Sequence, residues 1–161
     1  MNNQTKREAS GDKWFQLFGI ILWISILFLS LGNYNGSLYS IESTMNLVGL
    51  IQFIVGLSTM IYAQLNLGHN YSSFLVIKED HELIKHGLYK HVRHPVYTGG
   101  IIVAFSIPVY TSSVLGFLAA ILLIPLLIYR MGIEETMLIE EFGDEYREYM
   151  SNTKRWIPYL Y

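Results

Sequence analysis

Three long runs without a formal charge constrain this chain more than any other feature. They cover residues 14–31, 45–63 and 99–129. Because an α-helix rises 1.5 Å per residue and bilayer hydrocarbon is about 30 Å thick, each of the first two runs suffices for one crossing. Only 15% of the residues are charged, against about a quarter in soluble domains. The chain of 161 residues is therefore expected to form one compact membrane bundle.

The third run is too long for a single straight helix, which would extend about 46 Å at 1.5 Å per residue. Two tightly joined helices fit better, with Pro108 and residues 111–113 near the turn. Pro125 is expected to kink the last helix, or to lie where the freed carbonyl finds another partner. The predicted fold is an all-α membrane protein with transmembrane helices at about 14–31, 45–63, 99–111 and 114–130.

The basic residues predict the orientation of this bundle. All 11 lysines and arginines lie before residue 14, between residues 64 and 98, or from Arg130 onward. With four spans these regions share one side of the membrane, and the positive-inside rule makes that side cytoplasmic. We therefore predict an N-in, C-in single domain, 1–161, with a cytosolic tail, 1–13, and cytosolic segments 64–98 and 130–161.

Two local alternatives stay open at this level. The basic tail before residue 14 also resembles a secretory signal peptide, but the apolar run is longer than a usual signal core and no A-x-A site follows. We interpret it as a retained helix. Residues 74–77 fit either a short strand or a packed connector.

The C-terminal segment, residues 134–150, has apolar and acidic residues alternating at helical spacing, and predicts an amphipathic cytosolic helix. Gly143 weakens this helix. It either lies on the bilayer surface or closes as a lid over a cytosolic site.

The stretch from Gly87 to Gly99 concentrates cationic side chains, histidines, tyrosines and a proline between apolar regions. Polar groups close to hydrocarbon are costly unless they are buried in protein or face a cavity, so the default interpretation is a functional site. Two further polar clusters, residues 67–72 and 130–135, lie at the ends of neighbouring spans. A short bundle brings all three clusters together at one cytoplasmic surface.

Simpler interpretations exist for single members of these clusters. Arg93 and Arg130 are placed where they can extend to lipid headgroups, and Glu134 and Glu135 suit the first turn of a surface helix. The clusters taken together favour a site.

Metal and nucleic-acid binding are not predicted. The chain has five histidines but no cysteine, and no HExxH motif occurs, because His81-Glu82 is followed by His86 one residue too late. A basic stripe with interleaved aromatic residues, which nucleic-acid binding requires, is lacking in the sequence.

The polar residues of the second half form an ordered pattern: Gly87-x-Tyr89-x-x-x-Arg93-His94-Pro95-x-Tyr97-x-Gly99, then Arg130 and Glu134-Glu135, then Phe142-Gly143-x-x-Tyr146-x-x-Tyr149. This pattern resembles that of the isoprenylcysteine carboxyl methyltransferase family, and phospholipid N-methyltransferases share much of it. Leu67-Gly68-x-x-Tyr71-Ser72 also fits, with tyrosine where the family often has tryptophan. The resemblance covers roughly residues 45–158. The Arg-His-Pro core alone would be unspecific, because certain sterol reductases also carry it.

The resemblance implies a multi-pass membrane enzyme, in a bacterial-type plasma membrane or an endomembrane, that uses S-adenosylmethionine and a lipid-embedded methyl acceptor. The absence of a G-x-G-x-x-G motif agrees with a cofactor site outside a Rossmann domain. A glutamine of the family would fall near Phe74 and is not transferred. Arg130 matches the family's substrate-binding arginine, and Arg130 and Glu134 are the expected catalytic residues. The implied cofactor contacts are His81, Glu82, Leu83, Ile84, Tyr89, His94, Pro95, Val96, Tyr97 and Glu134.

The residue types suit methyl transfer to a carboxylate, which needs alignment and exclusion of water but no general base. Arg130 would hold the acceptor carboxylate, and Tyr89 and Tyr97 would face the sulfonium. Glu134 would accept a hydrogen bond from the cofactor's ribose or ammonium.

Three other functions remain as alternatives. In phospholipid N-methylation an amine acceptor would have to lose a proton, to His94 or Glu135. A nicotinamide-dependent sterol reductase shares the Arg-His-Pro region, but such enzymes are longer and have more spans. A non-enzymatic membrane scaffold would bind no nucleoside cofactor.

Overall fold

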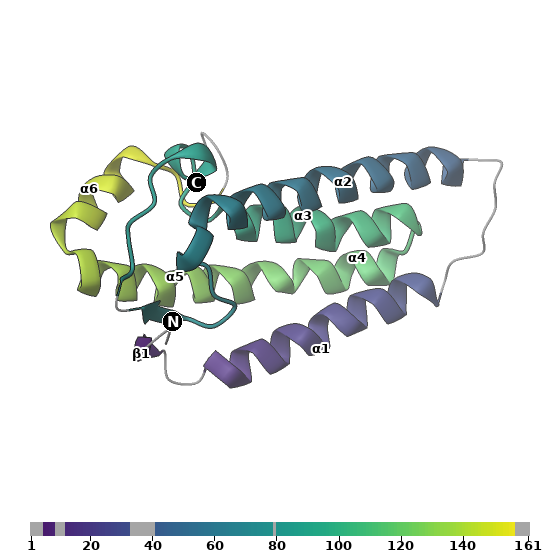
Figure 1. Ribbon diagram of the computed structural model, residues 1–161. Coiled ribbons are helices and arrows are strands. Elements are labelled where there is room, and N and C mark those ends of the chain that lie inside the picture. Colours follow the sequence, from purple (N-terminus) through teal and green to yellow (C-terminus); the bar gives the residue numbers. More distant parts are fainter. Residues whose placement is uncertain (1–4, 9–11, 33–40, 79, 157–161) are drawn as a thin grey trace.

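The computed structural model describes residues 5–8, 12–32, 41–78 and 80–156 (Figure 1). The helices and strands are, in chain order, β1 (Thr5–Glu8), α1 (Asp12–Leu31), α2 (Ile41–Leu67), the 3-10 helix η1 (Gly68–Asn70), β2 (Val76–Lys78), the 3-10 helix η2 (Gly87–Lys90), α3 (Pro95–Tyr110), α4 (Val114–Ile121), α5 (Leu123–Phe142) and α6 (Asp144–Asn152).

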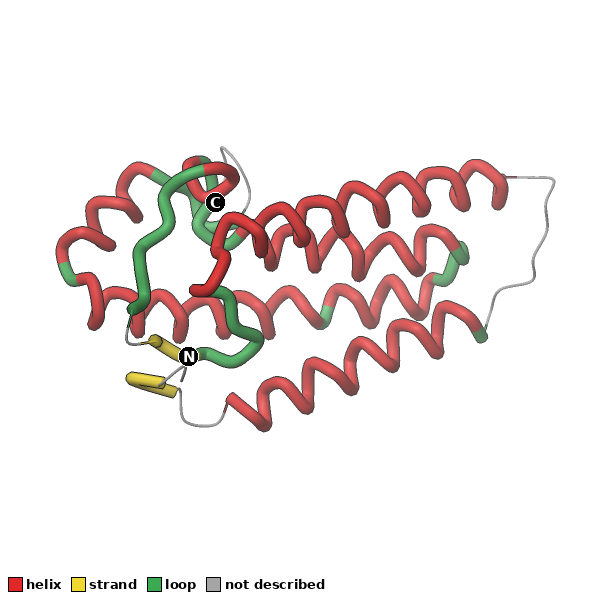
Figure 2. Tube along the Cα trace, viewed as in Figure 1, coloured by secondary structure: helices red, strands yellow, loops and turns green. Residues whose placement is uncertain are grey.

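Helices α2 and α3 lie side by side along much of their length (Figures 1 and 2). Gly56 on α2 and Gly99 on α3 allow this close contact. A Cβ atom on Gly56 would lie 2.9 Å from the carbonyl oxygen of Gly99, and one on Gly99 would lie 2.7 Å from that of Gly56. Small residues at such crossings let helix backbones approach each other in a membrane, where no hydrophobic force drives helices together.

The buried core joins α1, α3 and the α4–α5 pair. Its fully or nearly buried members are Leu22, Ile26, Ala104, Ala119, Ala120 and Leu123. Large apolar side chains of α1, α2 and α4 point outward instead; Trp14 and Phe28, for example, are each 77% exposed. By length and composition, Asp12–Leu31, Thr44–Asn70 and Val114–Phe142 are each able to cross a membrane, and α3 is a shorter apolar helix. The prediction of an all-α membrane bundle is therefore confirmed.

The turn predicted near residues 111–113 is also confirmed. Helix α3 ends at Tyr110, Ser112 has a φ of 52°, and the Ser113 hydroxyl accepts a hydrogen bond from the Gly116 amide as the N-cap of α4. Helix α4 then ends at Ile121, four residues before Pro125. Because proline cannot donate to the carbonyl of Ile121 and its ring crowds that oxygen, the helix breaks at Leu122 and restarts as α5.

An amphipathic C-terminal helix is present, but the prediction that it covers residues 134–150 is wrong, because it is α6 alone and residues 134–142 belong to α5. Helix α5 passes through the expected membrane boundary at Arg130 and continues to Phe142. Gly143 has a φ of 56°, a left-handed conformation that ends α5 and allows the chain to turn into the separate helix α6. The apolar spacing continues across Gly143, which is why the break was not expected.

A small sheet lies at the same end of the bundle as α6. Strand β1 pairs antiparallel with β2, so part of the predicted tail, 1–13, is ordered against the 64–98 segment. Of the two alternatives for residues 74–77, the short strand is correct for residues 76 and 77, and residues 74 and 75 belong to the connector. Residues 1–4 and 9–11 of that tail, residues 33–40 between the first two spans, and residues 157–161 lie outside the described residues.

The C-terminal segment runs beside the Arg-His-Pro segment at this end. The Arg93 amide donates to the Lys154 carbonyl (2.8 Å) and the His94 amide to the Arg155 carbonyl (2.9 Å). The Thr98 hydroxyl donates to the carbonyl of Trp156 (2.6 Å). The start of α3 is thereby held from the C-terminal side.

Candidate active site

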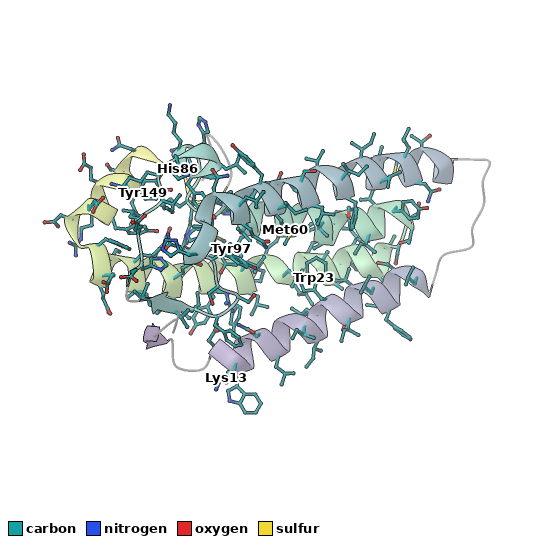
Figure 3. All side chains as sticks on the ribbon, viewed as in Figure 1. Lys13, Trp23, Met60, His86, Tyr97 and Tyr149 are labelled. Atoms are coloured by element: carbon teal, nitrogen blue, oxygen red, sulfur yellow. The ribbon has the colours of Figure 1, made fainter. Side chains whose placement is uncertain are left out.

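A cavity of about 380 Å³ lies at this polar end, between the start of α1, the connector after α2, the start of α3, and α5 and α6. Such a volume is in the range of small-molecule sites. One side of the cavity is polar. The other is an apolar arm, formed by Gly19, Ile20, Trp23, Leu123, Leu126 and Leu127. Figure 3 labels Tyr97 in the interior near the polar end and Trp23 on α1.

Arg130 lies where the polar side meets the apolar arm, and it is 7% exposed. Its Nε donates to the Tyr97 hydroxyl (3.0 Å) and its Nη2 to the Ser73 carbonyl (2.7 Å). Its Nη1 pairs with Oδ1 of Asp12 (2.8 Å), and the guanidinium carbon lies 5.2 Å from the centroid of the Phe15 ring. The guanidinium is thus fixed in position by contacts from three separate segments of the chain, the start of α1, the connector after α2 and the start of α3.

Tyr97 links Arg130 to Glu134. Its hydroxyl donates to Oε2 of Glu134 (2.9 Å) while it accepts from Arg130. The Glu134 side chain remains one-third exposed (33%), and its Oε2 lies 3.8 Å from Nδ1 of His94. Glu134 therefore keeps accessible carboxylate surface toward the cavity, with an orientation set by Tyr97.

Glu135, one residue further along α5, faces away from this group and anchors the start of α3 and the C-terminal segment. Its carboxylate pairs with Nε of Arg93 (2.9 Å), with Nη2 of Arg155 (2.9 Å) and with Nε2 of His94 (3.2 Å). Arg93 also donates to the Met150 carbonyl (3.1 Å). Since Glu135 is buried and engaged by three basic groups, its role is to position His94 and the backbone around it.

Three buried tyrosines close the cavity from η2 and α6. The Tyr149 hydroxyl donates to the carbonyl of Tyr89 (2.6 Å), and Tyr146 packs beside Tyr149 with ring centroids 5.8 Å apart. Burial raises the pKa of each of the three above its ordinary value, and the Glu134 carboxylate adds to the increase at Tyr89. They remain neutral near pH 7 and present aromatic surface.

The structure brings nearly all of the predicted site residues around this one cavity. Of the ten predicted cofactor contacts, nine line it, and so does Arg130. The exception is Pro95, which is fully buried as the first residue of α3. The 81–84 loop is held in place by Asn70, whose side-chain oxygen accepts from the Glu82 amide (3.1 Å).

Sequence reasoning missed the residues that fix Arg130 from outside the polar motifs. Asp12 stood in the predicted tail, and Ser73 contributes only its backbone carbonyl. An acidic residue directly before an apolar run is a signal for Asp12, since charges at such positions usually have partners. No signal in the sequence points to its partner.

Among the described residues, no group of three histidine, aspartate or glutamate side chains is placed to hold a metal ion. The histidines on the cavity wall instead contact carboxylates and rings: His94 lies beside Glu134 and Glu135, and the ring centroid of His81 is 6.0 Å from that of Phe142.

The fold and the cavity define an integral membrane protein with a cavity of small-molecule size at one end of a helical bundle. The sequence model of the isoprenylcysteine carboxyl methyltransferase (ICMT) family matches residues 47–140, more than half of the chain. The chain belongs to this family.

Relatives with assigned names are methyltransferases. The protein-S-isoprenylcysteine O-methyltransferase of Saccharomyces cerevisiae is 31% identical over 126 residues, which cover 76% of this chain and 53% of the relative. The probable enzyme of that name from Oryza sativa subsp. indica is 31% identical over 116 residues, 70% of this chain and 61% of the relative. Methanethiol S-methyltransferase 1 of Bradyrhizobium diazoefficiens is 43% identical over 72 residues, 45% of this chain and 25% of the relative.

The fold also matches a solved structure, that of the eukaryotic intramembrane Ras methyltransferase ICMT. The TM-score is 0.69 at 24% identity, over 94% of this chain and 55% of that chain. The chain spans less than two thirds of the length of each of these relatives.

Proposed function

We propose that this protein is a membrane methyltransferase that uses S-adenosylmethionine to methylate the carboxylate of a lipid-embedded acceptor of the isoprenylcysteine type. The observation that carries this proposal is the chain of hydrogen bonds from Arg130 through the Tyr97 hydroxyl to Glu134. This chain, called the relay below, lies where the polar side of the cavity meets the apolar arm. Family membership supports it, because the named relatives transfer methyl groups.

The polar side of the cavity fits this cofactor. S-adenosylmethionine supplies a methyl group on a positively charged sulfonium. Aromatic faces attract cations, and Tyr89, Tyr97, Tyr146 and Tyr149 line the wall beside the accessible carboxylate of Glu134. Glu134 would accept hydrogen bonds from the cofactor, and the 81–84 loop would supply the remaining contacts.

The apolar arm fits the lipid part of the acceptor. It begins next to Arg130 and continues between α1 and α5 toward the part of the bundle that lies at membrane depth. Arg130 would hold the carboxylate of a prenylated cysteine at the inner end of this arm, since a guanidinium pairs with carboxylates through two parallel hydrogen bonds.

The residues in this arrangement position the reactants and exclude water. Formation of an ester from a carboxylate releases no proton, so no side chain has to act as a base. Arg130 fixes the acceptor oxygen and the tyrosines shield it from water. Most of the rate would come from this alignment.

We place this site on the cytoplasmic side of the membrane, as the basic residues predict. The phospholipid N-methyltransferase and scaffold alternatives gain no support from the relatives.

The cofactor half of the proposal is tested by calorimetric titration of the detergent-solubilised chain with S-adenosylhomocysteine. Micromolar binding is expected, with a loss of about tenfold or more in Glu134→Gln, in which a charge-assisted hydrogen bond is weakened. Glu148→Gln on the exposed face of α6 is the matched control and should bind normally. Absence of binding to the folded chain would contradict the proposal.

A second candidate is methyl transfer to a small thiol. Two observations favour it: the Bradyrhizobium relative is named for methanethiol, and the charge of Arg130 is already balanced by Asp12, as suits an acceptor without a carboxylate. Turnover of methanethiol but not of a prenylated cysteine would establish this alternative.

A further inference from the structure

The contact between Asp12 and Arg130 bears directly on how an acceptor enters. Asp12 is the first residue of α1 and its side chain is 1% exposed, against 9% for that of Arg130. The 2.8 Å pair joins Asp12 to a guanidinium that lines the cavity. Asp12 is the anionic partner of this guanidinium, whose other two partners, the Tyr97 hydroxyl and the Ser73 carbonyl, are neutral.

An acceptor carboxylate bound to Arg130 would lie next to the carboxylate of Asp12. Three of the five N–H groups of the guanidinium are accounted for by these contacts, so a bidentate acceptor carboxylate would use the remaining N–H groups of Nη1 and Nη2, directly beside Asp12. Glu134 already places one negative charge nearby through Tyr97. Like charges brought together in a buried site strongly disfavour each other, and an acceptor carboxylate beside Asp12 would be the third negative group around one arginine.

Asp12 is also the partner that is easiest to displace. Tyr97 and Ser73 line the cavity themselves, whereas Asp12 begins a helix that packs mainly against α4 and only slightly against α5. Figure 1 shows α1 running at an angle to the other helices. The other oxygen of Asp12 accepts from the Leu75 amide (3.1 Å) and from Gln16 (3.0 Å), so the start of α1 is tied to the connector by a few hydrogen bonds.

We propose that Asp12 is a positioning residue that sets the acceptor selectivity of Arg130: it pairs with Arg130 when no acceptor is bound, and an acceptor carboxylate replaces it. This inference rests on the proposed carboxylate acceptor. A neutral acceptor carries no charge that competes with Asp12 for Arg130 and leaves the pair in place, so Asp12 lowers the affinity for carboxylate acceptors alone.

The test compares binding of N-acetyl-S-farnesylcysteine with that of its carboxamide, in the presence of S-adenosylhomocysteine, which has no methyl group to transfer. Asp12→Asn removes the competing charge at nearly the same size. It should tighten binding of the carboxylate about tenfold, equivalent to about 1.4 kcal/mol, and leave the carboxamide unchanged. In turnover, KM for the carboxylate should fall more than kcat changes.

Two further variants separate charge from docking of α1. Asp12→Glu keeps the competing charge and should bind both ligands as the unmodified chain does. Gln16→Ala removes the neighbouring hydrogen bonds to Asp12 and to the Ser73 carbonyl without changing charge, and should not discriminate between the ligands. A measurement on the unmodified chain avoids dependence on variants: hydrogen exchange at the start of α1 should rise when the carboxylate binds, and not when the carboxamide binds.

The outcomes are distinct. Equal changes in affinity for both ligands in Asp12→Asn would overturn the displacement, and so would hydrogen exchange at the start of α1 that does not change when the carboxylate binds. Asp12 would then only anchor α1. Failure of the unmodified chain to bind the prenylated carboxylate, despite binding S-adenosylhomocysteine, would overturn the proposed acceptor and this inference with it.

Discussion

Tyr97→Phe tests whether the hydrogen bonds of the Tyr97 hydroxyl to Arg130 and Glu134 contribute to function. It removes one oxygen atom from the site and keeps the ring. That oxygen accepts from Nε of Arg130 at 3.0 Å and donates to Oε2 of Glu134 at 2.9 Å. Its loss therefore leaves one hydrogen-bonding position open on each of the two charged groups that are proposed to hold the acceptor and the cofactor.

The expected size of the effect follows from these two bonds. A hydrogen bond to a charged group is worth about 1.5–3 kcal/mol, and Arg130 is buried while Glu134 is partly exposed. The Glu134 bond, partly replaced by water, should contribute the smaller share, which appears as a loss of about threefold to tenfold in affinity for S-adenosylhomocysteine. Misplacement of Arg130 adds to this, so kcat/KM should fall about 30- to 300-fold, since 1.4 kcal/mol corresponds to a factor of ten.

The assay pairs calorimetry with initial rates in the same detergent. Tyr62→Phe, on the exposed surface of α2, is the matched control and should alter neither quantity. A Tyr97→Phe protein with unchanged cofactor affinity and unchanged kcat/KM would refute the reasoning, because the relay would then carry no function.

Three further predictions concern stability. Glu135→Gln leaves Arg93 and Arg155 without their buried anionic partner and should lower the free energy of unfolding by about 3–5 kcal/mol, measured by denaturant titration in micelles. The control Glu145→Gln breaks the exposed pair with Lys85 and should lower it by less than about 1 kcal/mol. Equal losses in the two variants would contradict the account of Glu135. At Gly99 an added Cβ would lie 2.7 Å from the Gly56 carbonyl oxygen, so Gly99→Val should separate α2 from α3 and lower the thermal midpoint. At the neighbouring Gly100 an added Cβ would meet nothing within 4 Å, so Gly100→Val should leave the midpoint nearly unchanged. Burial raises the pKa of Tyr149 in the folded state, so the neutral phenol stabilises the fold below the unfolded pKa of about 10, and this contribution is lost as pH rises above it. The difference in unfolding free energy between the unmodified chain and Tyr149→Phe should therefore shrink from pH 9 to pH 11. A constant difference would contradict the assignment.

Much of the fold follows from local sequence. The apolar runs and the rise of a helix were sufficient to predict the crossings, and the Thr111–Ser113 turn followed from the length of the third run. Pro125 marked the break between α4 and α5 because the missing amide acts within one helical turn. What failed was the end of α5: helical periodicity continues past Arg130 to Phe142, and a single glycine at position 143 decides the break through its backbone conformation.

In the candidate site too, residues close together in the sequence were predicted and partners from distant segments were not. The residues from His81 to Tyr97 lie close together in sequence, and the resemblance to a family placed them in one pocket, which the structure also forms. The partners from distant segments were not predictable. Nothing local relates Asp12 to Arg130 or Arg155 to Glu135, since both pairs depend on how α1 and the C-terminal segment pack against α5.

The most direct test of the account is transfer of labelled methyl groups from S-adenosylmethionine to a prenylated cysteine by the purified chain in lipid bilayers. The account predicts a labelled product whose methyl group is released as methanol by mild base, as an ester requires, and predicts that folded Arg130→Ala and Glu134→Ala proteins form little of it. A folded protein that binds S-adenosylhomocysteine but forms no base-labile product from this acceptor would contradict the central claim.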